Sequence, residues 1–96
     1  MKAVVYTGDH RAELRDVDAP VAGAGQTIVD LAFCGICGSD MHAWHGKDER
    51  RIPPLILGHE AVGRATDGPL AGHLVAINPL MRCGACAACT GGDEHL

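Results

Sequence analysis

Three cysteines near the end of the chain have the spacing of metal ligands. Cys83, Cys86 and Cys89 follow one another at intervals of three positions, separated only by glycine and alanine. Zinc prefers tetrahedral sulfur at short range, and small intervening residues let the backbone curl around an ion. The competing interpretations are three buried cysteines in an alanine-rich lobe and an iron–sulfur cluster. The ferredoxin-type run disfavours the cluster, because it needs a fourth cysteine followed by proline where Asp93 and Glu94 stand.

A second group of candidate ligands lies earlier in the chain. Cys37 offers a thiolate and His59 offers an imidazole, and both are good zinc ligands. Asp40 is able to orient a ligating imidazole from behind. A site with so few protein ligands leaves a coordination position for water or an alcohol, which is typical of catalytic zinc. By spacing alone, a core cysteine with a structural histidine is an equally open interpretation.

The elements expected to position these residues are mostly short strands. The apolar pattern predicts strands over residues 2–6, 12–17, 26–33, 60–65 and 73–77, and turns over 7–9 and 67–69. The strand over 12–17 alternates polar and apolar residues, so we expect it to be half-buried. A short helix is expected from Ser39, as its N-cap. Because aromatic residues are few, any core should be mainly valine, leucine, isoleucine and alanine. The predicted fold class is mainly β, an open barrel whose loops carry the chemistry.

Composition excludes several functional classes. The 96 residues carry a formal charge of −4, and no basic cluster exceeds Arg50-Arg51, so nucleic acid is not an expected partner. No apolar run reaches the length of a membrane span, and the N-terminus lacks a signal-peptide core. The chain is therefore expected to be cytoplasmic. In such a reducing compartment, five cysteines indicate metal binding or reactive thiols more than disulfides.

Two shorter patterns are interpreted as decoys. Cys34 and Cys37 form a C-x-x-C pair, but the sequence lacks the βαβ context of a thioredoxin-like site. We expect Cys34 to be a small buried residue at a strand end. Gly23-Ala24-Gly25 begins like a dinucleotide fingerprint, yet it precedes a strand, whereas a true fingerprint follows one.

Three motifs together resemble those of a known family, in both order and spacing: Cys37-Gly38-Ser39-Asp40-Met41-His42, Gly58-His59-Glu60 and Cys83-x-x-Cys86-x-x-Cys89. They resemble the zinc-dependent medium-chain alcohol and polyol dehydrogenases. The whole chain, 1–96, looks like their N-terminal GroES-like catalytic domain, incomplete at its C-terminus and without a nucleotide-binding domain. The resemblance implies a partial barrel with short helices and a cysteine-rich zinc lobe.

The resemblance also implies two zinc ions and their ligands. Cys37 and His59 would hold the catalytic zinc, and Glu60 would stand behind them or swing in as an alternative ligand. The family's remaining catalytic ligand, a cysteine or glutamate, would come from chain beyond Leu96. The structural zinc would be held by Cys83, Cys86 and Cys89. In the family a fourth cysteine follows the third by eight positions. Counted from Cys89, that is the position immediately after Leu96. Without it, water, Asp93, Glu94 or His95 would complete a weaker site.

A proton path is implied as well. Ser39 would accept the substrate hydroxyl proton, His42 would pass it toward solvent, and Asp40 would support His59. Gly38 stands where some alcohol dehydrogenases carry an arginine for the cofactor pyrophosphate, which favours the polyol, sorbitol or threonine dehydrogenase branch.

The function implied is hydride transfer from a zinc-bound alkoxide to NAD or NADP, with a small alcohol or polyol as substrate. The cofactor would bind only in a full-length parent, so the isolated chain should be inactive. A further copy of the parent, in a homo-oligomer, is the one macromolecular partner that the resemblance suggests. One alternative is a standalone zinc-binding module without catalysis. Another is a redox sensor that uses Cys34 and Cys37. Ser39 and His42 favour the dehydrogenase, because a storage module has no use for a proton relay.

Overall fold

The computed structural model describes residues 1–93 and 95 of the chain. These residues form short strands, two small α-helices and one 3-10 helix. The elements in chain order are β1 (Lys2–Gly8), β2 (Arg11–Asp16), β3 (Val29–Gly35), α1 (Gly38–Trp44), β4 (Leu55–Ile56), β5 (Glu60–Ala65), η1 (Gly68–Leu70), β6 (Leu74–Ala76) and α2 (Ala87–Gly91). The predicted class, mainly β with short helices, is confirmed.

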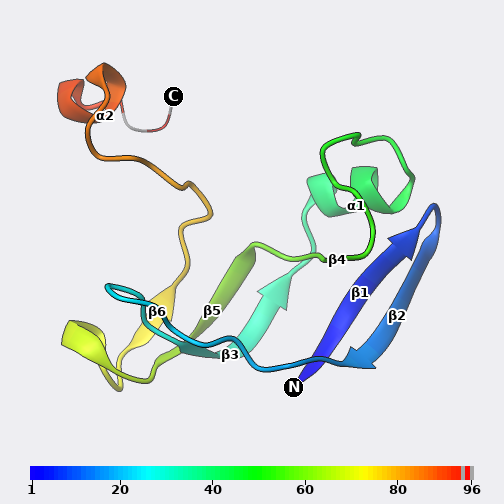
Figure 1. Ribbon diagram of the computed structural model, residues 1–96, viewed down its shortest axis with the longest axis horizontal. Helices are drawn as coiled ribbons and strands as arrows, with labels where there is room; N and C mark the ends of the chain where they lie inside the picture. The colour runs from blue at the N-terminus through cyan, green and yellow to red at the C-terminus, as the bar shows by residue number, and fades with distance from the viewer. Residues whose placement is uncertain (94, 96) are drawn as a thin grey trace.

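The strands form two small antiparallel sheets (Figure 1). One has the order β2-β1-β4 and the other the order β3-β5-β6. The helix α1 follows β3, and the chain then returns through β4 to the start of β5. The cysteine-rich lobe with α2 lies beyond β6, at the end of an extended connection that leads away from both sheets (Figure 1). The group around Cys37 and His59 therefore belongs to the sheets, and the three cysteines Cys83, Cys86 and Cys89 belong to the lobe.

The core is smaller than the sequence indicates. Its buried apolar residues are Ala3, Val5, Tyr6, Ala43, Ala61 and Ala65. Of the expected core of valine, leucine, isoleucine and alanine, the described residues bury alanines and Val5 but no leucine or isoleucine; Leu31 is 56% exposed, and the aromatic Phe33 is 77% exposed. In the part of the chain that the structure describes, each sheet has three strands, and β3 lies at the edge of its sheet. The apolar pattern of a strand states which face is apolar, not whether another element covers it.

Several predicted boundaries need correction. The strand predicted over 26–33 begins only at Val29, because Gln26 closes a turn by bonding Gly23 through both its backbone N–H and its side-chain oxygen. The strand predicted to be half-buried over 12–17 is β2, and all of its residues are exposed. It lies at the edge of its sheet, paired with β1 on one side only.

Two turn predictions differ in detail. The strand β1 continues through Gly8, and the chain reverses one residue later than expected. The turn predicted over 67–69 is the 3-10 helix η1, with Pro69 in its first turn. Among the described residues, no helix is long and apolar enough to cross a membrane.

Candidate metal centre

Strand pairing brings the candidate ligands Cys37, His59 and Glu60 together. In the antiparallel pair of β3 and β5, Gly35 at the end of one strand lies opposite Glu60 at the start of the other. Cys37 follows β3 and caps α1, while His59 immediately precedes β5. The candidate ligand atoms of Cys37, His59 and Glu60 consequently lie within 4.8 Å of one another. A thiolate, an imidazole and a carboxylate are all zinc donors, so this donor set fits the metal.

The Asp40 carboxylate lies behind two of these residues, Cys37 and His59. Its side chain is buried, which is unusual for a carboxylate without partners. One oxygen, Oδ2, accepts a hydrogen bond from the backbone N–H of Cys37 at 3.0 Å. The other, Oδ1, lies 3.5 Å from Nδ1 of His59. A carboxylate at Nδ1 leaves Nε2 of the imidazole available to a metal, the arrangement found behind many metal-bound histidines.

Arg51, which belongs to none of the sequence motifs, contacts this group from the loop after α1. Its Nη1 donates to Asp40 Oδ1 at 3.0 Å, and its Nη2 donates to Ser39 Oγ at 3.2 Å. Its Nε lies 3.4 Å from Asp48 Oδ2. In the sequence, Arg51 is indistinguishable from its neighbour Arg50, whose guanidinium is 90% exposed. Only the path of the loop separates their roles.

Ser39 and His42 lie on α1 at the positions that the motif predicts. The expectation that Ser39 caps the helix is wrong, because the cap is Cys37 and the Asp40 carboxylate satisfies its N–H. The Ser39 hydroxyl instead accepts from Arg51. His42 is exposed in the last turn of α1, three positions further along. Residues three apart share one side of a helix. Within the described residues, no hydrogen bond joins the two side chains.

Two glycines make room for the group. A Cβ atom on Gly35 would lie 2.9 Å from Oε2 of Glu60. Gly58, which precedes His59, has a φ of +115°, and a Cβ there would lie 2.6 Å from Sγ of Cys34. Cys34 itself is exposed, so the expectation of a buried residue is wrong, although it does lie near the end of β3. Its thiol contacts the carbonyl of Gly35 and lies outside the cluster of candidate ligands.

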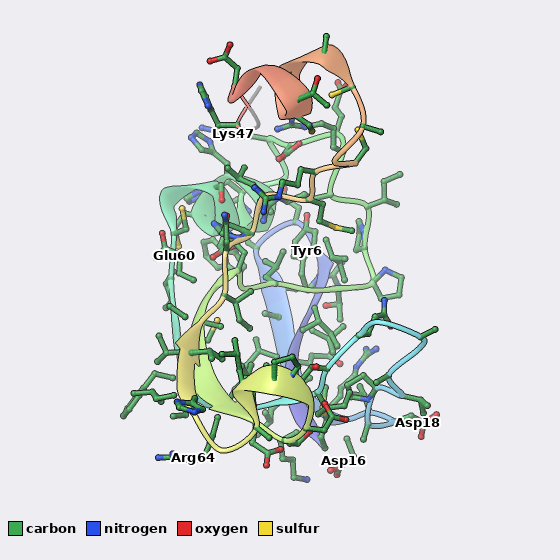
Figure 2. All side chains as sticks on the ribbon, turned by 90° about the vertical axis from the view of Figure 1, so that its left-hand side faces the viewer. Tyr6, Asp16, Asp18, Lys47, Glu60 and Arg64 are labelled. Atoms are coloured by element: carbon green, nitrogen blue, oxygen red, sulfur yellow. The ribbon has the colours of Figure 1, made fainter. Side chains whose placement is uncertain are left out.

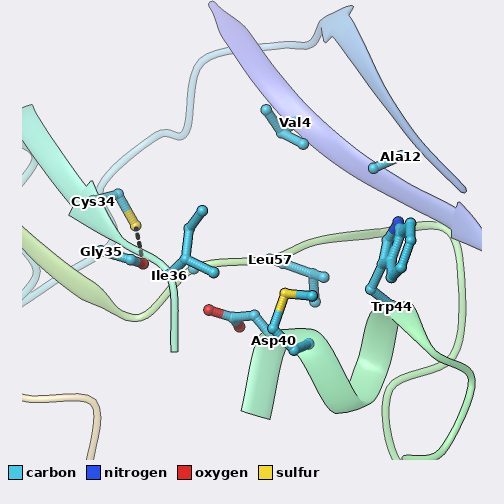
Figure 3. Close-up of a pocket in the computed structure, with 10 residues that line it drawn as sticks. Val4, Ala12, Cys34, Gly35, Ile36, Asp40, Trp44 and Leu57 are labelled. Carbon is cyan, nitrogen blue, oxygen red and sulfur yellow. Dashed lines mark hydrogen bonds between the residues drawn. The ribbon is translucent and has the colours of Figure 1, made fainter. Parts of the chain in front are cut away.

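The candidate ligands are neighbours of an apolar hollow between α1 and the first sheet (Figure 3). Its volume is about 450 Å³. Val4 and Ala12 of the first sheet face it from one side, and Met41 and Trp44 of α1 line the other. Asp40 is the one charged residue in its lining, and Glu60 lies at the end of β5 nearest α1 (Figure 2). The buried carboxylate therefore has apolar surroundings on one side and the candidate ligands on the other.

The three-cysteine group, Cys83, Cys86 and Cys89, is formed within the lobe. Sγ of Cys89 lies 3.9 Å from Sγ of Cys83 and 3.5 Å from Sγ of Cys86, and all three sulfurs fall within 4.8 Å of one another. The backbone N–H groups of Ala85 and Cys86 hydrogen-bond to Sγ of Cys83, and these bonds lower the pKa of its thiol to about 7. Three converging sulfurs fit zinc.

The alternative of three buried cysteines is wrong, since Cys83 and Cys86 are exposed and Cys89 is only half-buried. Of the residues considered as a further ligand, Asp93 and His95 are exposed, and Glu94 lies outside the described residues. The backbone N–H of Asp93 bonds the carbonyl of Ala88, just after α2.

Comparisons with known proteins agree with this geometry. The family of the alcohol dehydrogenase GroES-like domain matches residues 23–96. L-threonine 3-dehydrogenase of Pyrococcus furiosus is 35% identical over 106 residues, which cover 100% of this chain and 30% of that protein. Zinc dependent alcohol dehydrogenase 2 from Streptococcus pneumonia superposes with a TM-score of 0.85 at 33% identity, over 96% of this chain and 28% of that one.

A third similar protein was solved with a cofactor. It is a short chain alcohol dehydrogenase from E. coli CFT073, complexed with NADH, with a TM-score of 0.86 and 29% identity over 98% of this chain and 29% of that one. The chain thus spans about 30% of the length of the curated relatives it matches. The predicted GroES-like fold is confirmed, and the chain belongs to the zinc-dependent medium-chain alcohol dehydrogenase family.

Proposed function

We propose that this chain is the zinc-binding part of an NAD(P)-dependent alcohol or polyol dehydrogenase, and that Cys37 and His59 hold its catalytic zinc. The observation that carries the proposal is the convergence of Cys37, His59 and Glu60 within 4.8 Å, with the buried Asp40 carboxylate behind the first two. A site with so few protein donors has room for a substrate oxygen. Glu60 is then either a further ligand or a group held ready behind the site.

Zinc bound at this site would supply Lewis acidity, which lowers the pKa of an alcohol hydroxyl beside it. Ser39 and His42 of α1 would accept the released proton and pass it to solvent. A hydroxyl oxygen has two lone pairs, and Arg51 occupies one of those on Ser39. The other is free to accept the substrate proton. His42 is exposed, so its imidazole is placed to exchange that proton with water.

The nicotinamide belongs to the longer protein in this proposal. Where the fingerprint-like Gly23 and Gly25 occur, the described residues form a loop that leads into β3, not a strand-to-helix turn. We therefore expect the 96-residue chain alone to catalyse no oxidation of alcohols or polyols with NAD or NADP. The NADH bound by the E. coli relative supports a nicotinamide cofactor for the longer protein. All five cysteines are free, which supports a cytoplasmic location.

The lobe would hold a second zinc with a structural role, bound by Cys83, Cys86 and Cys89. Its sulfurs converge within 4.8 Å, and they lie far along the chain from the proton-handling side chains of α1. Three thiolates leave one tetrahedral corner to another donor. We expect the 96-residue chain to bind this zinc more weakly than a site with four cysteines.

Cobalt titration tests the catalytic assignment. Changing Cys83, Cys86 and Cys89 to serine removes the candidate metal ligands of the lobe. Thiolate-to-cobalt charge transfer then reports only the site at Cys37. In that background, Cys37→Ser and His59→Ala should abolish tight Co²⁺ binding. Cys34→Ser is the matched control, since its thiol lies only three positions away but outside the cluster, and it should leave the charge-transfer band intact. A band that survives in Cys37→Ser refutes the assignment.

The same sample separates a dehydrogenase site from a standalone zinc-binding module. A catalytic site keeps an exchangeable coordination position, whereas a structural site is closed. Azide should therefore shift the visible bands of Co²⁺ bound at Cys37 and His59. A spectrum that does not respond to azide would favour the module without catalysis.

A further inference from the structure

We propose that Arg51 is the positioning residue of the catalytic centre: it fixes the Asp40 carboxylate that aligns Cys37 and His59. This inference rests on the proposed function of that site. Arg51 touches no candidate ligand directly, so it would act through Asp40 and Ser39. None of the zinc motifs includes Arg51, because this residue lies in the loop between α1 and β4.

Both carboxylate oxygens of Asp40 have partners, and Arg51 fixes the orientation of the carboxylate. Oδ2 accepts the N–H of Cys37 at 3.0 Å, while Oδ1 faces Nδ1 of His59 at 3.5 Å. The guanidinium donates to that same Oδ1 at 3.0 Å. Without it, only the N–H of Cys37 holds the carboxylate, through Oδ2, and the contact of Oδ1 with His59 is lost first because it is the longest. The guanidinium therefore locks the group behind both proposed ligands.

The second contact of Arg51 extends this role to Ser39. Nη2 donates to Ser39 Oγ at 3.2 Å, so one rigid guanidinium spans two adjacent residues of α1. An arginine presents its donors in a fixed fork, whereas a lysine is a point charge on a flexible stem. The fork also orients the Ser39 hydroxyl, because the lone pair that it occupies cannot accept a substrate proton. Lysine would keep the charge and lose this alignment.

Burial distinguishes Arg51 from an ordinary surface arginine. Its side chain is 26% exposed and that of Asp40 is 8% exposed. Exposed ion pairs contribute little, but a pair this far from solvent is less screened and its geometry matters more. Arg50 is the natural comparison, since it also binds Asp48 and carries the same charge, yet its side chain is 90% exposed and it makes no contact with Asp40.

The test compares Arg51→Gln with Arg50→Gln in the 96-residue chain. Co²⁺ affinity is measured by competition with a chelator in two backgrounds: one lacks the lobe cysteines and reports the Cys37 site, and the other carries Cys37→Ser and reports the lobe. Arg51→Gln should weaken Co²⁺ at the Cys37 site by about 10- to 100-fold, the range for groups that orient metal ligands. Arg50→Gln should change it by less than about twofold, as expected for a surface substitution. Neither substitution should change the lobe.

Asp40→Asn identifies the route. If Arg51 acts through Asp40, adding Arg51→Gln to Asp40→Asn should cost less than about twofold more, because coupled residues are not additive. Should Arg51→Gln fail to fold, Arg51→Lys is compared with Arg50→Lys by the same criteria.

Three results would overturn the inference. The first is an equal Co²⁺ affinity of the Cys37 site in Arg51→Gln and Arg50→Gln. The second is a loss of Co²⁺ affinity at the lobe in Arg51→Gln that matches the loss at the Cys37 site. The third is full additivity of Arg51→Gln with Asp40→Asn. Absence of cobalt binding at Cys37 in the otherwise unchanged site would refute the proposed function itself, and the inference with it.

Discussion

Replacing Gly35 with alanine would test whether the Glu60 carboxylate belongs to the metal site. A Cβ atom at position 35 would lie 2.9 Å from Glu60 Oε2 and 3.2 Å from Glu60 Cβ, whereas ordinary contacts begin at 3.4 Å. The carboxylate oxygen must therefore move by at least 0.5 Å, the difference between 3.4 and 2.9 Å. Gly35 has no left-handed backbone conformation, so alanine adds this contact without backbone strain.

The size of that shift decides the expected effect. Functional constellations tolerate displacements of about 0.5 Å, so the forced movement is at the limit. Oε2 is the end of a flexible side chain and can yield, but Glu60 Cβ is fixed to the strand. Overpacking of this kind costs about 1–3 kcal/mol, and we expect the lower end for the free energy of unfolding. If Glu60 is a ligand, Co²⁺ affinity should fall about tenfold, equivalent to about 1.4 kcal/mol.

The assay is the same cobalt titration, carried out without the lobe cysteines. Gly38→Ala is the matched control, because a Cβ at that glycine meets nothing within 4 Å. It should keep the affinity, and alanine at a helical position should hold or raise stability by up to about 1 kcal/mol. Glu60→Gln supplies the comparison for the carboxylate. If Gly35→Ala keeps full Co²⁺ affinity while Glu60→Gln loses it, the steric reasoning is refuted. If both keep it, Glu60 is no ligand in this chain.

Three further outcomes are expected. In a longer protein that contains this chain, Ser39→Ala should keep the metal but slow turnover by about 100-fold and alter the pH–rate profile, as for loss of a proton-transfer group; an unchanged profile would exclude the relay. In the metal-free chain, the rate at which iodoacetamide modifies Cys83 should rise with pH with a midpoint near pH 7. The N–H groups of Ala85 and Cys86 lower the pKa of this thiol, and the thiolate, which is present above that pH, is the nucleophile. Peptide mapping across pH checks this, and a midpoint near 9.0 would contradict it. Adding one cysteine after Leu96 should raise the zinc affinity of the lobe in a chelator competition, and equal affinities would show that a fourth thiolate does not matter.

The residues brought together by local structure were the predictable ones. Cys37 and Asp40 are separated by one helical turn, and His59 is adjacent to Glu60, so their motifs need little tertiary information. Joining the two pairs needs the antiparallel pairing of β3 with β5; the apolar runs predicted the two strands but not that they pair. The zinc lobe is more local still, because its sulfurs converge within seven residues.

What escaped prediction depends on chain paths and on coverage. Arg51 reaches Asp40 because the loop after α1 turns back over the helix, and neither composition nor periodicity encodes that turn. The exposure of Phe33 likewise depends on whether another layer lies against β3, which the apolar residues of this strand do not indicate. The Ser39 cap failed for a physical reason. A carboxylate three positions after Cys37 was available to the free N–H, so the hydroxyl was released to a different partner.

The two metal groups therefore depend on folding to different degrees. The Cys37 group draws on the end of β3, the start of β5 and the loop that carries Arg51, so its ligands converge only when the second sheet is paired and α1 is in place. Metal bound there would stabilise that whole arrangement, because binding to the folded state alone shifts the folding equilibrium. The lobe ligands need only a few consecutive residues to curl, and the lobe lies apart from the sheets (Figure 1). Metal bound in the lobe would stabilise the lobe without fixing the sheets. The arginine contact consequently matters most at the site whose ligands are most widely separated in sequence.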